Sequence, residues 1–508
     1  MSLAITPSRE KTPEFLYETT RSICPVCRLL LDAQVILRDN QVIQRKRCPQ
    51  HGLFEALVFN DAELFQRIAR YNTSGITPLG YATQSTHNCP YECGLCPDHK
   101  QHTCLGVIEV TNACNLDCPM CFADAGTQHA KDGYWLTHDQ VDFMLNQLLA
   151  FEDKPEVVQF SGGEPTLHPY LVDFVNLAHQ KGIQYVMVNT NGLRIANDQH
   201  FVDRLAKARP HIYLQFDGFE ERTYRMLRGR EDLLEVKLRA LDRLKTAGLR
   251  VVLVAVIERG VNDHEMGRIV DFGLKHPAVF GVTFQCAFHA QRYLPFDPLQ
   301  RMTIPDVVAG INAQTKGLFQ PADFVPVPCC KPECSFVSYA ILDGDSITPL
   351  PRVIDLDPYM DHIKGRTLPA LDAEVATILS HLFSSSAIAG SAHLAQDVQQ
   401  LAVNVTLTSE SHSTRTGQRC PACQVGIPLG GHSLDDMSRH VFMLNIRDFA
   451  DAWTFNLNTV MKCCLGFLIP DGRIIPFCAY NTLDYRQKVV ESLMAEKSRS
   501  TVIPIPGF

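Results

Sequence analysis

The sequence has no apolar run that is long enough to cross a membrane. Its apolar stretches, such as Tyr185–Val188 and Val251–Ile257, have the length of single strands, whereas a spanning helix needs about 20 apolar residues. A signal peptide is also missing, because Arg9, Glu10 and Lys11 follow only a short apolar start. We therefore expect a cytoplasmic protein without a transmembrane segment, attached at most peripherally to the inner membrane face.

Positive charge is scarce as well. The 508 residues carry 47 Lys and Arg against 55 Asp and Glu, which gives a net charge of −8. The only dense basic run is Arg45-Lys46-Arg47, whereas nucleic-acid-binding proteins show a broader basic surface. We predict no nucleic-acid partner. A hydrophobic content of 45% and a charged content of 20% are typical of a soluble globular protein, here long enough for several domains.

Cysteine, in contrast, is abundant and clustered. The chain has 19 cysteines, an odd number that includes adjacent pairs at 329–330 and 463–464. A secreted protein would use such cysteines for disulfides. The adjacent pairs and the missing signal peptide instead favour metal centres in a reducing cytoplasm.

The most informative cysteines stand in Cys114-Asn-Leu-Asp-Cys118-Pro-Met-Cys121, at C-x3-C-x2-C spacing. A four-iron cluster normally takes four thiolates. Three closely spaced ligands leave one iron open, and an open iron can bind and reduce a small molecule. The loop therefore predicts a reactive iron–sulfur site.

Residues 1–75 contain two metal-binding knuckles on either side of a predicted hairpin. Thiolate and imidazole donors at this spacing suit tetrahedral zinc or a single iron of the rubredoxin kind. We interpret the segment as a metal ribbon in which a closed site stabilises a small fold, and a redox role is the minor alternative. The four predicted donors are Cys24, Cys27, Cys48 and His51.

Residues 76–105 form a predicted loop with four further thiolates and little structure between them. A closed, fully ligated iron–sulfur cluster is our preferred interpretation, and a second zinc site is the alternative. The four cysteines are Cys89, Cys93, Cys96 and Cys104.

Residues 106–318 show a regular alternation of apolar strands and amphipathic helices. This pattern is typical of a parallel sheet covered by helices. About six units are visible, so we predict an α/β fold with a partial (β/α)6 barrel rather than an eightfold one. Functional side chains of such folds sit at the carboxyl ends of strands. The candidates at or just past these ends are Cys114, Gly162, Asn189, Gln215 and Gln285.

Residues 319–508 break the alternation, and we predict a cysteine-rich C-terminal α+β domain. Helices are expected at 371–383 and 392–403, and a Ser/Thr-rich loop at 408–417. The pair Cys420 and Cys423 stays open between a zinc half-site, cluster ligands and free thiols.

The end of the chain contains a predicted hairpin with cysteines at both outer ends. Pro470-Asp471-Gly472 reads as its turn between two apolar strands. The hairpin places Cys463 or Cys464 near Cys478.

The Cys114 loop and the residues after it resemble the radical S-adenosylmethionine (SAM) superfamily. Ser161-Gly-Gly-Glu-Pro165 is similar to its Gly-Gly-Glu-Pro motif, while Asn189-Thr-Asn-Gly192 and Gln215-Phe-Asp-Gly218 resemble its polar contacts to methionine and ribose. Glycines let the backbone approach the cofactor, and Glu164 can accept hydrogen bonds from its ammonium group. The cofactor-binding residues implied by this resemblance are Gly162, Gly163, Glu164, Pro165, Asn189, Asn191, Gln215, Asp217, Gln285 and Met120.

The resemblance implies reductive chemistry. SAM would bind the open iron, and one electron from a donor such as flavodoxin or ferredoxin would cleave it to a 5′-deoxyadenosyl radical that removes hydrogen from an unactivated C–H bond. Met120 stands where the superfamily usually has an aromatic residue, and methionine can also pack on adenine. The catalytic residues implied are Cys114, Cys118 and Cys121.

Over its whole length the chain resembles the tetraether lipid synthase group and its bacterial relatives. The shared patterns are the two ribbon knuckles, the Cys89–Cys104 loop, the Cys114 loop and the run from Pro470 to Asn481. The resemblance implies a mononuclear Fe or Zn site, the SAM-binding [4Fe-4S] cluster and two auxiliary [4Fe-4S] clusters. The first auxiliary cluster falls on Cys89, Cys93, Cys96 and Cys104. The second falls on Cys329, Cys334, Cys463 and Cys478, with Cys330 and Cys464 as rivals.

Such a synthase forms carbon–carbon bonds between lipid tails, so a lipid or another hydrophobic substrate is expected. Two alternatives are a radical SAM methyltransferase acting on a small heterocycle such as a pterin, and a peptide-modifying radical SAM maturase. A non-enzymatic iron–sulfur carrier is disfavoured, because a carrier does not need the SAM-pocket motif at Gly162–Pro165.

Overall fold

The computed structural model describes residues 13–352 and 441–499, apart from 87–88, 153–154, 156, 184, 328 and 345. The helices expected at 371–383 and 392–403, the loop at 408–417, and Cys420 and Cys423 lie outside the described residues.

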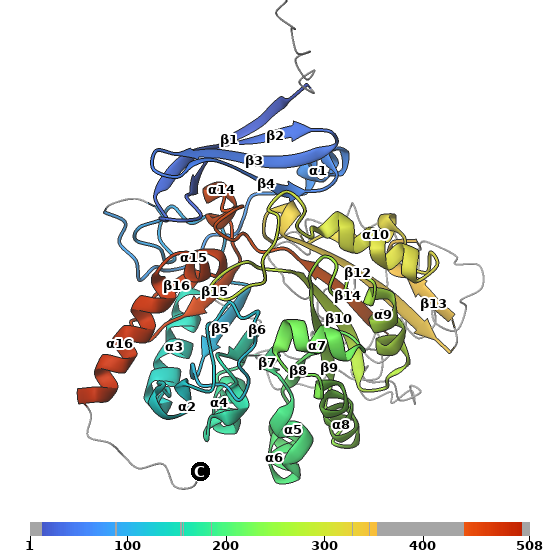
Figure 1. Ribbon diagram of the computed structural model, residues 1–508. Coiled ribbons are helices and arrows are strands. Elements are labelled where there is room, and N and C mark those ends of the chain that lie inside the picture. The colour runs from blue at the N-terminus through green and yellow to red at the C-terminus, as the bar shows by residue number, and fades with distance from the viewer. Residues whose placement is uncertain are drawn as a thin grey trace, which may run out of the picture.

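The N-terminal ribbon is a four-stranded antiparallel sheet (Figure 1). Its strands are β1 (Phe15–Ile23), β2 (Leu30–Arg38), β3 (Gln41–Cys48) and β4 (Gly52–Phe59), and helix α1 (Ala62–Ile68) follows them. Asp39 and Asn40 both have positive φ values, 52° and 56°, as a two-residue hairpin between twisted strands requires. The predicted pair of knuckles joined by a hairpin is therefore present.

Six consecutive parallel strands form the centre of a second, larger sheet (Figure 1). They are β5 (Leu105–Glu109), β6 (Val157–Ser161), β7 (Tyr185–Thr190), β8 (His211–Gln215), β9 (Val251–Ile257) and β10 (Val279–Cys286). The helices between them are α2 (His129–Asp132), α3 (His138–Phe151), α4 (Leu171–Gln180), α5 (Leu193–Asn197), α6 (Gln199–Ala208), α7 (Glu221–Arg228), α8 (Leu233–Thr246) and α9 (Met266–Lys275), and α10 (Ile304–Gln314) follows β10.

Strands from the C-terminal part of the chain extend this sheet at both edges. β14 (Val441–Arg447) pairs parallel with β10, and β15 (Leu465–Leu468) pairs parallel with β5. Antiparallel strands complete the two sides. They are β11 (Val325–Pro326), β12 (Ser335–Asp343) and β13 (Ser346–Pro349) beyond β14, and β16 (Ile474–Pro476) beyond β15. The C-terminal part ends in α14 (Leu457–Val460), α15 (Phe477–Thr482) and α16 (Tyr485–Arg499).

The two faces of the strands belong to two different apolar clusters. In β9, Val251, Leu253 and Ala255 pack under the covering helices, while Val252 and Val254 join a second cluster with residues of β5, β8 and β14. Strands buried on both faces are continuously apolar, which explains the run Val251–Ile257. The second cluster fills the inner side of the curved sheet.

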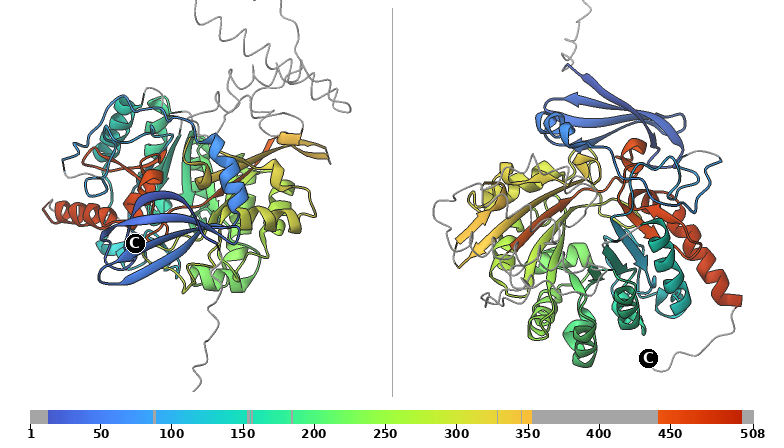
Figure 2. Two further views of the ribbon diagram at one scale, coloured as in Figure 1. Left: turned by 90° about the horizontal axis from the view of Figure 1, so that it is seen from above. Right: turned by 180° about the vertical axis from the view of Figure 1, so that it is seen from behind.

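The ribbon lies over the loops that follow β10 and β14 (Figure 2). The buried Lys46 donates hydrogen bonds to the carbonyls of Ala452 and Trp453 at 2.7 and 2.9 Å. Phe54 of the ribbon packs edge-on against Trp453. These contacts fasten the metal ribbon to the larger sheet, at the ends of its strands. The parallel strands β5 to β10 and their helices are called the barrel below.

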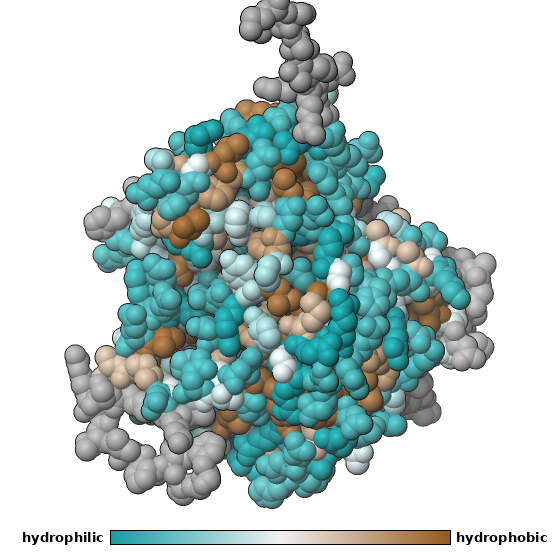
Figure 3. Space-filling view, in the orientation of Figure 1, coloured by the Kyte–Doolittle hydropathy of each residue, from teal (hydrophilic) through white to brown (hydrophobic). Residues whose placement is uncertain are grey.

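None of the helices in the described ranges is both long and apolar enough to cross a membrane. On the face shown in Figure 3, apolar side chains form small patches between polar ones, as is normal for a surface in contact with water.

Candidate active site and metal centres

The Cys114 loop begins directly after β5, at the carboxyl end of the parallel strands. Cys114 is buried, and Cys118 and Cys121 are half-buried. The loop is closed by hydrogen bonds from Thr127 to Asp117 at 2.7 and 2.5 Å and by backbone pairing of Cys121 with Arg292. Burial raises the pKa of the Cys114 and Cys118 thiols above their ordinary value, and binding to iron removes that cost because the thiolate is the ligand.

Two glycines let the turn after β6 lie against the backbone that leads into Cys114. The amide of Gly163 donates to Thr111 O, and the amide of Glu164 to Ala113 O, both at 2.8 Å. Gly162 has a φ of +132°, and a Cβ at either glycine would collide with one of these carbonyls. Only glycine permits this close approach, which agrees with the predicted role of the motif.

Glu164 is 1% exposed and is bound by the protein itself. Its Oε1 accepts hydrogen bonds from Thr166 N, Thr166 Oγ1 and Thr190 Oγ1, and its Oε2 accepts one from Asn191 N. The carboxylate thus ties the turn after β6 to the turn after β7. Oε2 keeps acceptor capacity, so the contact to the SAM ammonium stays a prediction. Pro165 begins the short helix that follows.

Asn191 connects these turns with the cysteine loop. Its Nδ2 donates to Asn115 Oδ1 at 2.7 Å and lies 4.0 Å from Cys114 Sγ. Asn189 lies within β7 itself. Its side chain donates a weak hydrogen bond to Ser161 Oγ at 3.4 Å. The asparagines of the predicted motif therefore lie beside the candidate iron ligands.

Gln215 and Asp217 belong to a buried polar network at the end of β8. Arg228 donates to both oxygens of Asp217 at 2.8 and 2.7 Å. Lys237 donates to Gln215 Oε1 at 2.8 Å and also to the carbonyl of Asn191. Burial lowers the pKa of the Lys237 ammonium to about 8. The network fixes the two residues that the sequence assigns to ribose and methionine contacts.

Lys237 and Arg228, which hydrogen-bond to these predicted contacts, could not be singled out by the motifs in the sequence. Lys237 lies on the buried stripe of α8, between Val236 and Ala240. A lysine on an apolar helix stripe is a detectable signal, because buried charges need partners.

The remaining two predicted cofactor contacts are Met120 and Gln285, for which the described residues show no side-chain hydrogen bond to the Cys114 loop. Met120 is 5% exposed and packs with Leu227, Val261 and Ala287. Gln285 is half-buried near the end of β10, in register with Val256. Their roles toward the cofactor stay predictions.

A second ion pair, also absent from the sequence analysis, joins the C-terminal helix α16 to the base of the cysteine loop. Arg486 binds both oxygens of Glu109 at 2.5 and 2.6 Å, and Tyr480 donates to the same carboxylate at 3.2 Å. The guanidinium also lies over the ring of Phe122, which follows Cys121. The end of the chain thereby supports the loop.

The ribbon donors Cys24, Cys27, Cys48 and His51 converge, with all donor atoms within 4.8 Å of one another. Cys27 Sγ and Cys48 Sγ are 3.8 Å apart, and His51 Nδ1 lies 3.6 and 3.5 Å from Cys24 Sγ and Cys48 Sγ. A tetrahedral ion with metal–sulfur bonds of about 2.3 Å requires sulfurs about 3.8 Å apart. The geometry fits one mononuclear metal ion.

Apart from Cys286, the other cysteines of the described ranges lie in one region beside β5 and β15, and their grouping differs from the sequence prediction. Cys104, expected with the Cys89–Cys96 loop, has its thiol within 4.8 Å of those of Cys329 and Cys464. The sulfur atoms of Cys329 and Cys464 are 3.0 Å apart. Cys330 lies near enough to Cys464 and Cys334, and Cys463 near enough to Cys478, to influence the pKa of those thiols. Cys89 lies near Cys96, and Cys93 lies near both of them and near Cys463. The structure therefore brings the rivals Cys330 and Cys464 into the region.

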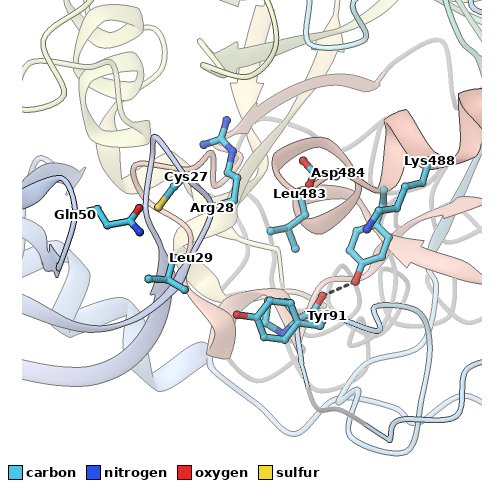
Figure 4. Close-up of a pocket in the computed structure, with 10 residues that line it drawn as sticks. Cys27, Arg28, Leu29, Gln50, Tyr91, Leu483, Asp484 and Lys488 are labelled. Carbon is cyan, nitrogen blue, oxygen red and sulfur yellow. Dashed lines mark hydrogen bonds between the residues drawn. The ribbon is translucent and has the colours of Figure 1, made fainter.

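A cavity of about 430 Å³ opens between the ribbon, the loop at Tyr91 and the start of α16 (Figure 4). Among the predicted site residues, only Cys27 lines this cavity. No residue of the Cys114 loop lines it, so the cavity is distinct from the site at the carboxyl ends of the parallel strands. Its lining comprises Cys27, Arg28, Leu29, Gln50, Pro90, Tyr91, Leu483, Asp484, Tyr485 and Lys488.

Two family models match the chain. The radical SAM superfamily matches residues 108–273, and the HMPTM N-terminal zinc ribbon domain matches residues 16–60. Both matches coincide with the parts of the structure just described, which confirms the radical SAM α/β fold and the N-terminal zinc ribbon.

Among curated relatives, the 7,8-dihydro-6-hydroxymethylpterin dimethyltransferase of Methanocaldococcus jannaschii is 32% identical over 498 residues, which cover 93% of this chain and 94% of the relative. A GTP 3′,8-cyclase of Chlorobaculum tepidum is 32% identical over 176 residues, 33% of this chain and 49% of that enzyme. The solved structure of SuiB of Streptococcus suis bound to S-adenosylmethionine aligns with 42% of this chain and 46% of its own, at 16% identity and a TM-score of 0.33.

The full-length relative corrects the preferred sequence interpretation. It supports the pterin methyltransferase alternative better than the tetraether lipid synthase, and none of these relatives supports lipid biosynthesis. The chain is a radical SAM enzyme and belongs to the family of the 7,8-dihydro-6-hydroxymethylpterin dimethyltransferase.

Proposed function

We propose that this enzyme is a radical SAM methyltransferase that acts on a small pterin. The observation that supports it most is the match to a pterin dimethyltransferase along almost the whole of both chains. A lipid substrate has no comparable support.

The three thiols of Cys114, Cys118 and Cys121 would hold the SAM-binding iron–sulfur cluster. Their number fits a cluster with one open iron, and the glycine-packed turn gives the backbone room for a cofactor. When bound, the cluster and SAM supply a 5′-deoxyadenosyl radical that removes hydrogen from a C–H bond. An electron donor such as flavodoxin or ferredoxin would supply the electron.

The protein's own residues would hold the reactants in place. Lys237 donates hydrogen bonds to the Asn191 carbonyl and to the side chain of Gln215. These bonds would hold both polar groups in one arrangement beside the Cys114 loop. Met120 lies on a buried apolar wall that suits an adenine ring. Preorganised groups of this kind lower the cost of orienting a reactant.

We propose further that the cysteine region holds two auxiliary iron–sulfur clusters. Cys104, Cys329 and Cys464 would serve one of them, and the Cys89–Cys96 loop with its neighbour Cys463 would contribute to the other. Cys93, Cys96, Cys104, Cys329 and Cys464 are buried, which suits closed clusters. The ribbon would hold zinc, which fits its name in the family model and its donor spacing.

The test combines the purified, iron-reconstituted enzyme with dithionite, SAM and 6-hydroxymethyl-7,8-dihydropterin. We expect 5′-deoxyadenosine and a pterin whose mass has increased by one or two methyl substitutions. SAM labelled with carbon-13 in its methyl group would show whether SAM is the methyl source. 5′-Deoxyadenosine whose amount does not increase when the pterin is added, together with an unchanged pterin, would reject the proposed substrate and keep the enzyme class.

A further inference from the structure

Arg447, the last residue of β14, is a cation without a matching anion. It makes no ion pair and no side-chain hydrogen bond within the described part of the chain. It pairs in register with Gln285 of β10 and with Ser335 of β12. It therefore stands at the carboxyl ends of the strands, next to Cys334.

The guanidinium belongs to the inner face of the sheet. Side chains alternate along a strand, so Arg447 shares a face with Met443, which packs in the inner apolar cluster together with Tyr213. Ile446 and Leu444 pack in the opposite, helix-covered cluster. A charge in such a place is costly unless an opposite charge lies nearby.

Buried thiols close to Arg447 are candidates for that opposite charge. Cys104, Cys329 and Cys464 are 2%, 1% and 4% exposed and have converging sulfur atoms. Burial lowers the pKa of the Arg447 guanidinium, but Tyr213, Cys464, Cys330 and Cys329 raise it above its ordinary value. These residues therefore surround Arg447 at electrostatic range.

Lys462 is a second cation near these thiols and is buried, whereas Arg447 is half-buried. Lys462 is already engaged. It donates to Asn72 Oδ1 at 2.8 Å and to the Thr73 carbonyl. Glu333 lies close enough to offset its charge. Arg447 has no such carboxylate among the described residues, so its charge faces these thiols and the phenol of Tyr213.

We propose that Arg447 compensates the negative charge of the iron–sulfur cluster at Cys104, Cys329 and Cys464 and thereby raises its reduction potential. A thiolate-ligated cluster becomes more negative when it accepts an electron, so a nearby cation stabilises the reduced form more than the oxidised form. Net charge around a cluster is one of the established determinants of its potential. Arg447 would be a tuning residue that does not touch the substrate.

The test is a potentiometric titration of the fully reconstituted enzyme with dithionite, followed by electron paramagnetic resonance. Arg447→Gln is expected to move one cluster signal to a more negative midpoint potential. A tenfold change in its reduction equilibrium corresponds to about 59 mV for one electron. The SAM-binding cluster is recognised because its signal changes when SAM is added, and its potential should stay the same.

Two further variants separate charge from structure. Arg447→Lys keeps the charge and should keep the wild-type potential. Lys207→Gln removes an exposed positive charge from α6, on the outside of the barrel, and should shift no signal. If Arg447→Gln fails to assemble the cluster, Arg447→Lys must restore it; failure of both variants would overturn the charge assignment.

The inference rests on the proposed auxiliary clusters, and the two can fail separately. Iron at the level of a single cluster would reject the proposed clusters. Full iron content with an unchanged potential in Arg447→Gln would reject the role of Arg447. An unchanged potential with weaker pterin binding would assign Arg447 to the substrate instead.

Discussion

The ribbon and the Cys114 loop both gather cysteines within a short stretch of chain, yet their donor sets differ in one respect. The ribbon offers four donors, Cys24, Cys27, Cys48 and His51, whose spacing fills the coordination shell of one ion. The loop offers three thiols and no fourth protein donor. The closed set suits stability and the open set suits chemistry, so the number of donors separates a structural site from a reactive one.

The surroundings of the two sites agree with this difference. The ribbon site sits at the end of a small sheet that is docked on the barrel through Lys46 and Trp453. The loop lies against a glycine turn and polar networks that converge on it from β6, β7 and β8. A reactive site needs such support, because its ligands and substrate must be held in one geometry.

The largest effect should follow from removing one ligand of the open set. Cys118→Ala is expected to lower 5′-deoxyadenosine formation at least about a thousand-fold, since residues that act as one catalytic unit fail together. The iron content should fall by one cluster, and zinc in the ribbon should remain. Cys286→Ala is the matched control, because this buried cysteine belongs to none of the donor groups found in the described residues. Residual SAM cleavage near the wild-type rate would contradict the assignment of the loop.

Removing a ligand of the closed set should instead affect stability. Cys48→Ala is expected to release the mononuclear metal and to unfold the ribbon, as small metal-dependent folds do. SAM cleavage driven by dithionite should fall less than about tenfold, or about 1.4 kcal/mol. Metal analysis and the fluorescence of Trp453, which packs on Phe54 of the ribbon, report the change. A thousand-fold loss of cleavage would mean that the ribbon takes part in the chemistry.

Local sequence patterns predicted both of these regions, because all their donors come from short segments. The β/α alternation likewise predicted the parallel strands from β5 to β10. The pairing of β15 with β5 was not predictable, since Leu465 and Leu105 are far apart in sequence and parallel pairing leaves no local turn signal.

The grouping of the remaining cysteines was not predictable for the same reason. Cys104 meets Cys329 and Cys464 only because β15 returns to the edge of the barrel beside β5. The support of the loop by Glu109 and Arg486 depends on the same return of the C-terminal chain.

A smaller effect should distinguish the glycine turn of the open site from an ordinary turn. In Gly162→Ala the new Cβ meets a φ of +132° and collides with Thr111 O. We expect the free energy of unfolding to fall by about 3–5 kcal/mol, and SAM binding to be lost. Gly182 also has a positive φ, +86°, but no atom lies within 4 Å of its missing Cβ. Gly182→Ala should therefore cost only about 1 kcal/mol. Urea unfolding and SAM binding measure both, and equal losses would show that close packing at Gly162 is unimportant.

The smallest effect concerns pH and should appear in the barrel alone. His168 follows the Gly-Gly-Glu-Pro turn, is 2% exposed, donates to Leu136 O at 3.0 Å and accepts from Tyr170 N at 3.2 Å. Burial lowers its pKa from 6.5 to about 4. Between these values the unfolded chain binds more protons than the folded one, so stability falls as the pH falls from about 6.5 to about 4, by about 3 kcal/mol.

His168→Gln keeps a hydrogen-bond donor and an acceptor but cannot titrate. The part of the stability loss at acid pH that comes from His168 should therefore disappear. Trp135 lies with its ring centre 5.6 Å from that of His168, and Trp453 lies at the ribbon contact. These are the two tryptophans of the chain. In Trp135→Phe the remaining Trp453 reports the ribbon contact, and in Trp453→Phe the remaining Trp135 reports the barrel. His168→Gln should flatten the acid response of Trp135 and leave that of Trp453 unchanged. If both tryptophans respond alike, the ribbon and the barrel unfold as one unit. The two regions would then differ in their chemistry but not in their folding.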